Sequence, residues 1–161
     1  MAAWSAVLRG DGQPHTLLGR VFDALEDRQR GCNFLLVGIE AYPQTPEFQF
    51  VNGPSVWLSG EELTQIVRQE DFQWVWGAFL AFSPEISKEW ALSNTSALYV
   101  PQSSDWDSWQ VRNRFLETGA QFMIFADDST ATELLTQDRE LVDGFCRQEP
   151  QANVTRLERK E

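Results

Sequence analysis

The stretch AQFMIFADDSTATELLTQDREL (Ala120 to Leu141) places two apolar segments on either side of a short polar one. Residues 120–126 form the most apolar run of the C-terminal half, and we expect one strand there and a second at 132–136. The polar residues between them have the length and the Asp and Ser content of a hairpin loop. Strands joined by so short a turn must pair antiparallel, which predicts a mainly antiparallel or mixed sheet.

Further strands are predicted around this hairpin, where apolar runs are bounded by turn residues. The longest is FQWVWGAFLAFS (residues 72–83), which is too apolar to face water and should form a central strand. Alternation would turn every second residue, from Trp74 to Phe82, toward the same face of the sheet. Other strands are expected at 32–42, 47–51, 55–58 and 96–100, with either a short edge strand or a frayed end at 154–157.

Helices are predicted where apolar residues recur every 3.6 residues or where a capping residue is present. Residues 14–29 show that spacing, with Pro14 suited to a first helical position and Gly31 as a stop signal. Ser59 and Glu62 form a capping box for a helix that runs to about residue 69. The remaining helices are expected at 104–118 and 138–147, with a short helical turn at 84–92.

These elements describe one α+β domain, with three to four helices packed on the sheet. The chain has 161 residues, which is the size of one ordinary domain, and it shows no repeat and no linker. We assign the domain to residues 1–150 and treat residues 151–161 as a polar C-terminal tail or a short edge strand.

The formal net charge is −11, from 24 acidic and 13 basic residues. Nucleic acid and anionic membranes both require a positive patch, so this balance argues against them and favours a basic protein as partner. Cys32 and Cys146 form no CxxC motif, which indicates free thiols in a reducing compartment. The N-terminus lacks the features of a signal peptide and no apolar run is long enough to span a membrane, so a cytoplasmic location is expected.

Residue types that carry catalysis are scarce in this chain. His15 is the sole histidine, and no GxSxG, GxGxxG or P-loop motif occurs. Asp127, Asp128 and Glu133 are the best candidates if the protein is a small enzyme or a ligand-binding domain that uses carboxylates. A metal ion would need further ligands, so the two adjacent aspartates are better explained as turn residues. We therefore expect no catalytic residue, no metal site and no cofactor.

Tryptophan beside acidic residues is the pattern that most favours a binding role. The segment VPQSSDWDSWQVRNRF (Val100 to Phe115) has two Trp residues three apart at a predicted helix start, the first between two Asp residues. This mixture is typical of protein interfaces, although one Trp could instead pack on the sheet. A third Trp precedes an acidic pair in PSVWLSGEE. The predicted partner-binding residues are Trp57, Glu61, Glu62, Asp105, Trp106, Asp107 and Trp109.

In size, charge and the layout that ends in FLETGAQFMIFADDSTATELLTQDRELVDGF (Phe115 to Phe145), the chain resembles the small acidic immunity proteins of bacterial toxin systems. The resemblance implies a non-catalytic inhibitor that neutralises a basic partner, such as a bacterial toxin, by occluding its active or substrate-binding surface. It assigns no functional residue, because these families are diverse. The alternatives are the carboxylate enzyme or ligand-binding domain and a structural subunit that self-associates.

Overall fold

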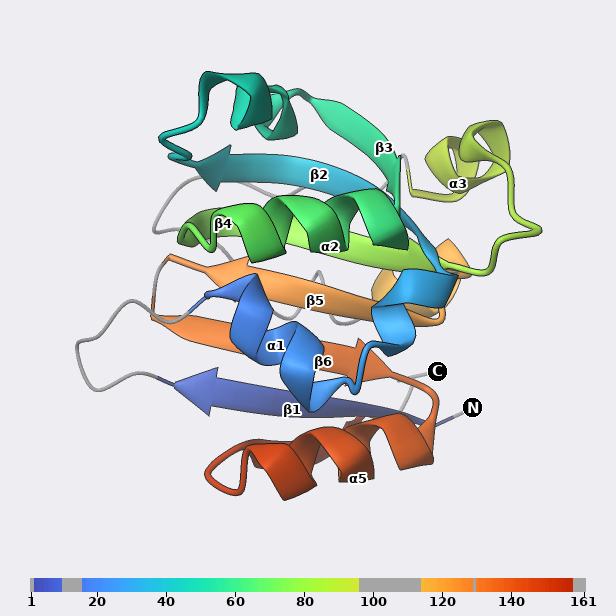
Figure 1. The fold of residues 1–161 in the computed structure, drawn as a ribbon. Coiled ribbons are helices and arrows are strands. Elements are labelled where there is room, and N and C mark those ends of the chain that lie inside the picture. Colours follow the sequence, from blue (N-terminus) through green and yellow to red (C-terminus); the bar gives the residue numbers. More distant parts are fainter. Residues whose placement is uncertain (1, 10–15, 96–113, 129, 158–161) are drawn as a thin grey trace.

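The computed structural model describes residues 2–9, 16–95, 114–128 and 130–157. Within these residues seven strands form one sheet in the order β3-β2-β4-β5-β6-β1-β7, and every neighbouring pair is antiparallel (Figure 1). The predicted α+β fold with an antiparallel sheet is confirmed. The strands are β1 (Ala3–Arg9), β2 (Asn33–Ala41), β3 (Ser55–Ser59), β4 (Trp74–Phe82), β5 (Phe122–Asp127), β6 (Ala131–Thr136) and β7 (Asn153–Leu157).

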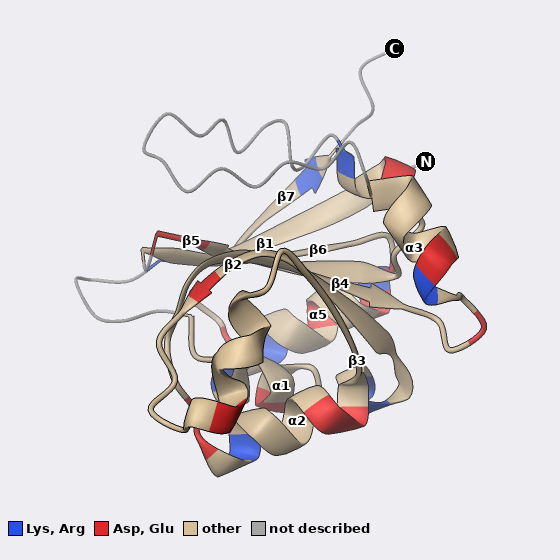
Figure 2. Cartoon of the chain, turned by 90° about the horizontal axis from the view of Figure 1, so that it is seen from above, with Lys and Arg blue, Asp and Glu red and all other residues tan. Residues whose placement is uncertain are grey.

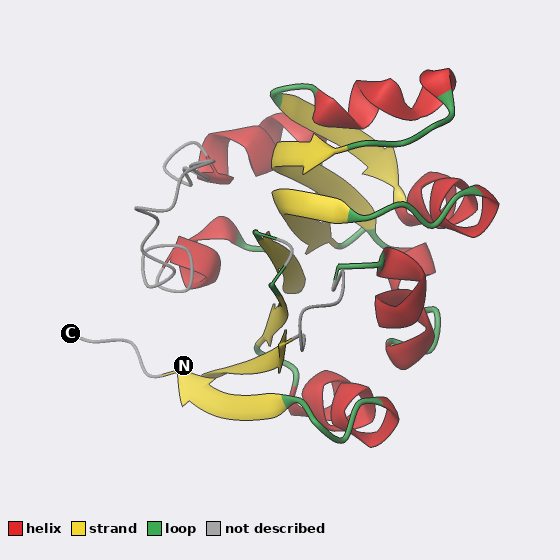
Figure 3. Cartoon of the chain, turned by 90° about the vertical axis from the view of Figure 1, so that its left-hand side faces the viewer, coloured by secondary structure: helices red, strands yellow, loops and turns green. Residues whose placement is uncertain are grey.

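Helices cover both faces of the sheet, as the side view in Figure 3 shows. One face carries α1 (Leu18–Ala24), α2 (Gly60–Gln69) and α5 (Arg139–Gln148), and the other carries α3 (Lys88–Thr95) and a helical stretch at 114–118. Within the described residues these five helical stretches exceed the three to four expected, and two short 3-10 segments, η1 (Arg28–Gly31) and η2 (Pro46–Asn52), are present as well.

Two separate cores explain why the central strands have no polar face. The larger core lies under α1, α2 and α5, and the smaller one lies on the opposite face of the sheet. β4 contributes to both, since Phe79 belongs to the first core and Leu80 to the second. The prediction that residues 72–83 form a central strand is confirmed, because β4 lies between β2 and β5.

The predicted alternation along β4 is wrong at its first residue. Trp74 packs in the larger core with Phe79, their ring centroids 4.9 Å apart, instead of sharing a face with Ala78 and Phe82. Ala41 lies opposite Trp74 and the preceding residue of β2 lies opposite Trp76, so Val75 is an extra residue in β4. Such a bulge rotates the chain and transfers the side chain before it to the other face.

The strand predicted at residues 47–51 is also wrong, because this segment is the 3-10 helix η2. Pro46 occupies its first turn and removes a backbone donor that a strand would use. The side chain of Asn52 accepts a hydrogen bond from the N–H of Ala41 at 2.8 Å and donates one to its carbonyl at 2.9 Å. These two bonds take the place of the backbone hydrogen bonds that a neighbouring strand would make at the end of β2.

Helix α1 is shorter than the 14–29 expected. Leu17 is extended and forms a β-bridge with Gln73, so the helix begins at Leu18. At the other end Glu26 and Asp27 adopt left-handed backbone angles, with φ of 53° and 61°, and the chain continues as η1.

Two of the remaining elements differ from the sequence prediction: strand β1 was not predicted, and α3 covers Lys88–Thr95 where a short helical turn was expected at 84–92. The hairpin β5–β6, helices α2 and α5, strand β3 and the edge strand β7 are confirmed within one or two residues. The strand at 96–100 and the start of the helix at 104–118 lie outside the described residues, as does Pro14.

Candidate functional site

The structure separates the predicted partner-binding residues that it describes. Trp57 lies on the smaller-core face of β3, where its ring centroid is 6.0 Å from that of Phe82. Glu61 and Glu62 begin α2, which packs on the opposite face. Asp105, Trp106, Asp107 and Trp109 lie outside the described residues.

Glu61 and Glu62 also have roles within the fold. The carboxylate of Glu61 accepts a hydrogen bond from Arg30 at 2.8 Å, which ties α2 to η1. The hydroxyl of Ser59 accepts a hydrogen bond from the backbone N–H of Glu62 at 3.1 Å, which confirms Ser59 as the N-cap. Both carboxylates are nevertheless at the surface beside the end of β3.

The region around β3 carries exposed aromatic side chains that sequence reasoning missed. Tyr42, directly after β2, is 68% exposed, and Phe50, in η2, is 49% exposed. We call Glu40, Tyr42, Glu47, Phe50 and Trp57 the β3-edge surface. The strand predicted at 47–51 would place Phe48 and Phe50 on the same, half-buried face. In a 3-10 helix residues two apart point about 120° away from each other, so Phe48 packs on the core while Phe50 faces solvent.

The backbone that presents these aromatic side chains is held by hydrogen bonds. The carboxylate of Glu70, which follows α2, accepts hydrogen bonds from the N–H of Gln44 at 2.7 Å and from the N–H and hydroxyl of Thr45 at 2.9 and 2.7 Å. These bonds, led by that from the Thr45 hydroxyl, lower the pKa of Glu70. The Gln49 side chain donates to the carbonyl of Pro43 at 2.9 Å. The loop from β2 to β3 is therefore preorganised.

The charged residues within the segment that forms this edge are acidic, and Arg30, just outside that segment, pairs with Glu61. The sequence contains no Lys, Arg or His between Arg30 and Arg68, whereas Glu40, Glu47 and the acidic pair at the start of α2 all fall there. Figure 2 looks onto this edge from above and marks the acidic positions in red. The hydroxyl of Tyr42 donates to the carboxylate of Glu40 at 2.5 Å, and this bond raises the pKa of Tyr42.

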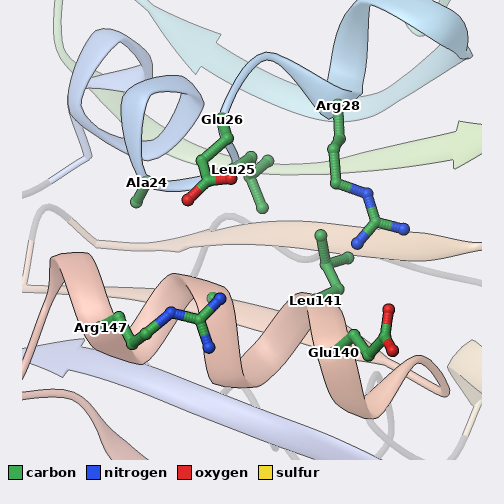
Figure 4. Close-up of a pocket in the computed structure, with 8 residues that line it drawn as sticks. Ala24, Leu25, Glu26, Arg28, Glu140, Leu141 and Arg147 are labelled. Carbon is green, nitrogen blue, oxygen red and sulfur yellow. The ribbon is translucent and has the colours of Figure 1, made fainter.

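The face covered by α1, α2 and α5 has a different character, because its charges pair with one another. Glu149 accepts a bidentate pair of hydrogen bonds from Arg20, and Asp138 accepts one from Arg28 at 2.8 Å. A groove of about 190 Å³ between α1 and α5 is lined by charges of both signs (Figure 4). It is smaller than the roughly 300–1,000 Å³ usual for ligand pockets.

A second hollow, of about 380 Å³, lies beside α1 and is lined by Gly19, Arg20, Asp23, Ala24, Arg68, Asp71, Gln148 and Glu149. Its charged groups are engaged in the fold. Arg68 donates to Asp23 at 2.6 Å, and Asp71 accepts the N–H of Gly19 at 3.1 Å. We infer a structural role for this hollow.

Neither of the two hollows described above is lined by a carboxylate considered for catalysis. The carbonyl of Asp127 accepts the N–H of Thr130 at 2.9 Å, and Asp128 has a left-handed φ of 46°, so both belong to the hairpin turn as predicted. Glu133 is buried in β6 and accepts a hydrogen bond from the hydroxyl of Ser5 at 2.5 Å. In the described part of the chain, no three His, Cys, Asp or Glu side chains are grouped to hold a metal ion.

Comparison of the chain with protein-family models, curated proteins and solved structures gives no match. None of the described helices is both long enough and apolar enough to cross a membrane. The feature best suited to a function is the β3-edge surface, which combines exposed aromatic side chains, a fixed backbone and acidic charge.

Proposed function

We propose that this protein is a non-catalytic acidic binding module that acts in the cytoplasm as an inhibitor or immunity protein. It neutralises a basic partner, such as a bacterial toxin, by covering the active or substrate-binding surface of that partner. The single observation that carries the proposal is the β3-edge surface, where Tyr42 and Phe50 are exposed on a hydrogen-bonded segment of the chain whose charged residues are all acidic.

The two kinds of side chain contribute to different steps of binding. Acidic residues raise the encounter rate with a basic protein, by roughly 10- to 1,000-fold for a strongly steered pair. Aromatic residues then supply buried contact area, and a side chain of this size stabilises a complex by about 1.5–3 kcal/mol when it is fully covered. Because the loop is already ordered, little conformational entropy is lost when the partner binds.

The observations support this function better than they support the alternatives. An enzyme that uses Asp127, Asp128 and Glu133 would need all three carboxylates to meet one substrate, whereas Glu133 is buried and bonded to Ser5 and the backbone of the two aspartates forms the hairpin turn. Self-association through the β3-edge surface would bring acidic surfaces of two copies together, which like-charge repulsion opposes.

The test is capture of a partner by the tagged full-length chain from a lysate of its native host, with washes at low and high salt. We expect one stoichiometric basic polypeptide that is retained at low salt and released at high salt. The charge reversal Glu40→Lys with Glu47→Lys should abolish capture.

The matched control places the same change in charge on another face. Glu26→Lys with Glu140→Lys alters two exposed carboxylates that line the groove between α1 and α5 (Figure 4). This variant should retain most of the captured partner, and circular dichroism verifies that both variants are folded. Loss of the partner with both variants, or capture of no basic polypeptide by the unaltered chain, would exclude the proposed surface.

A further inference from the structure

Strand β3 forms one end of the sheet. It pairs with β2 on one side, in a register that runs from Ser55 opposite Val37 to Ser59 opposite Asn33. No described strand pairs with its other side. Within the described residues, the outer edge of β3 is therefore unpaired and can accept a further strand.

The direction of the free backbone groups follows from the register. One step beyond Ser59, the N–H of Gly60 donates to the carbonyl of Cys32 at 2.7 Å, which makes this a hydrogen-bonded pair. Such pairs alternate with non-hydrogen-bonded ones in an antiparallel ladder. Ser55 and Trp57 thus occupy non-hydrogen-bonded positions, and their N–H and C=O groups point away from β2.

This edge lacks the devices that prevent strand addition in many proteins. Edge strands are commonly protected by Lys, by Pro or by inward-pointing charges. The sequence of β3, SVWLS, has none of these, and Pro54 precedes the strand without interrupting it. The backbone N–H and C=O groups of Ser55 and Trp57, which point away from β2, can therefore form hydrogen bonds with an added strand; we call these groups the template.

Acidic residues lie at both ends of this template and determine what can bind it. Glu47 lies in η2, which leads into β3, and Glu62 lies at the start of α2 directly after β3, next to Glu61, whose carboxylate is paired with Arg30. Two copies joined antiparallel through β3 would place the acidic residues of one copy beside those of the other. Charge complementarity instead favours a segment with basic side chains.

We propose that β3 accepts an extended segment of a basic partner, rich in Lys or Arg, as an additional antiparallel strand. This inference rests on the proposed function and specifies how the partner docks. Backbone bonds to Ser55 and Trp57 hold the segment, the half-buried Trp57 ring contacts its side chains, and the carboxylates at the two ends of β3 receive its cations.

The test uses the full chain and the synthetic peptide acetyl-Lys-Val-Lys-Val-Lys-Val-Lys-amide, followed by NMR. The control is a peptide of the same sequence that is N-methylated at alternate residues, on the edge that would face β3. It has the same charge but fewer backbone N–H donors. We expect the unmethylated peptide to slow amide exchange at Ser55 and Trp57 and to bind about tenfold more tightly than the methylated one. Equal binding by both peptides, or unchanged exchange at these two amides, would overturn strand addition.

A variant pair tests the same contact from the side of the protein. Ser55→Pro removes an outward N–H without removing a bond to β2, whereas Ser55→Ala keeps that N–H. The proline variant should bind the peptide and any captured basic partner roughly three- to tenfold more weakly, and the alanine variant should bind like the unaltered chain.

The outcomes separate the two proposals. In one outcome, the charge reversals Glu40→Lys and Glu47→Lys abolish capture of a basic partner, but the partner binds Ser55→Pro normally and leaves amide hydrogen exchange at Trp57 unchanged. This outcome would support the proposed function and exclude strand addition. Absence of any basic partner, together with absence of peptide binding, would exclude both.

Discussion

Oε1 of Glu70 accepts hydrogen bonds from both the backbone N–H and the hydroxyl of Thr45, at 2.9 and 2.7 Å. The two residues are far apart in the sequence, and their contact joins the end of α2 to the loop that leads into η2. Because this loop carries Tyr42 and leads into η2, which carries Phe50, the Glu70–Thr45 contact helps to fix both side chains of the β3-edge surface.

Replacement of Glu70 should loosen this loop without unfolding the protein. In Glu70→Ala the N–H groups of Gln44 and Thr45 lose their acceptor, so we expect their hydrogen exchange to be several-fold faster, with unchanged exchange in β4. Glu85→Ala, which alters another exposed carboxylate, serves as the control. Unchanged exchange at Gln44 and Thr45 in the Glu70 variant would show that other contacts hold the loop.

The loop should also respond to acid in a defined direction. The hydrogen bonds from Thr45 and Gln44 lower the pKa of Glu70 below its ordinary value of 4.5. For a carboxyl with a lowered pKa, the stabilisation is present above 4.5 and is lost as the pH falls through the folded-state pKa. NMR titration should therefore find that the Gln44 and Thr45 amide signals shift with a midpoint below pH 4.5. A midpoint at or above 4.5 would contradict this assignment.

The ion pair between Arg20 and Glu149 should contribute measurably to stability. Glu149 is buried, and besides the two bonds from Arg20 it accepts one from Gln151 at 2.8 Å. Since the Arg20 side chain remains 44% exposed, solvent weakens the pair, and we expect Glu149→Ala to lower the free energy of unfolding by about 1–2 kcal/mol.

Urea denaturation measures this effect, and a surface pair provides the comparison. Arg139 and Asp143 form an exposed pair four residues apart on α5, so Asp143→Ala should change stability by less than about 0.5 kcal/mol. Equal effects of the two substitutions would show that burial of Glu149 adds nothing to the strength of its pair.

The exposed aromatic residues should matter for binding and only modestly for stability. Tyr42→Ala removes a side chain that is 68% exposed and Phe50→Ala one that is 49% exposed, so the unfolding free energy should fall by no more than about 0.5 kcal/mol for the first and about 1.5 kcal/mol for the second. Each variant should weaken binding of a captured basic partner by roughly tenfold, as measured by titration calorimetry. Val154→Ala, on β7 at the other end of the sheet and 47% exposed, should bind normally.

Part of the candidate site was accessible from the sequence. Trp57, Glu61 and Glu62 do lie beside the open edge of the sheet, and the absence of basic residues between Arg30 and Arg68 is visible without a structure. Tyr42 and Phe50 were missed, because the segment around Phe50 was assigned to a strand with its aromatic side chains buried. Its 3-10 conformation depends on Asn52 meeting Ala41, a contact between segments that local propensity does not specify.

What the sequence alone determined is local in origin. The β5–β6 hairpin follows from a short Asp- and Ser-rich turn, the start of α2 from the Ser59 cap, and the central position of β4 from its lack of polar residues. Each of these depends on neighbours within a few positions in the chain.

Tertiary structure decided the rest. β1 is a strand because β6 and β7 pair with it on either side, and Trp74 changes face because pairing with β2 leaves Val75 as an extra residue. The sheet also separates Trp57 from Glu61, although they are four positions apart, because the chain turns at Ser59 from the edge strand into a helix on one face. Partners distant in the sequence set these features, since hydrogen bonds and burial are satisfied only in the assembled sheet.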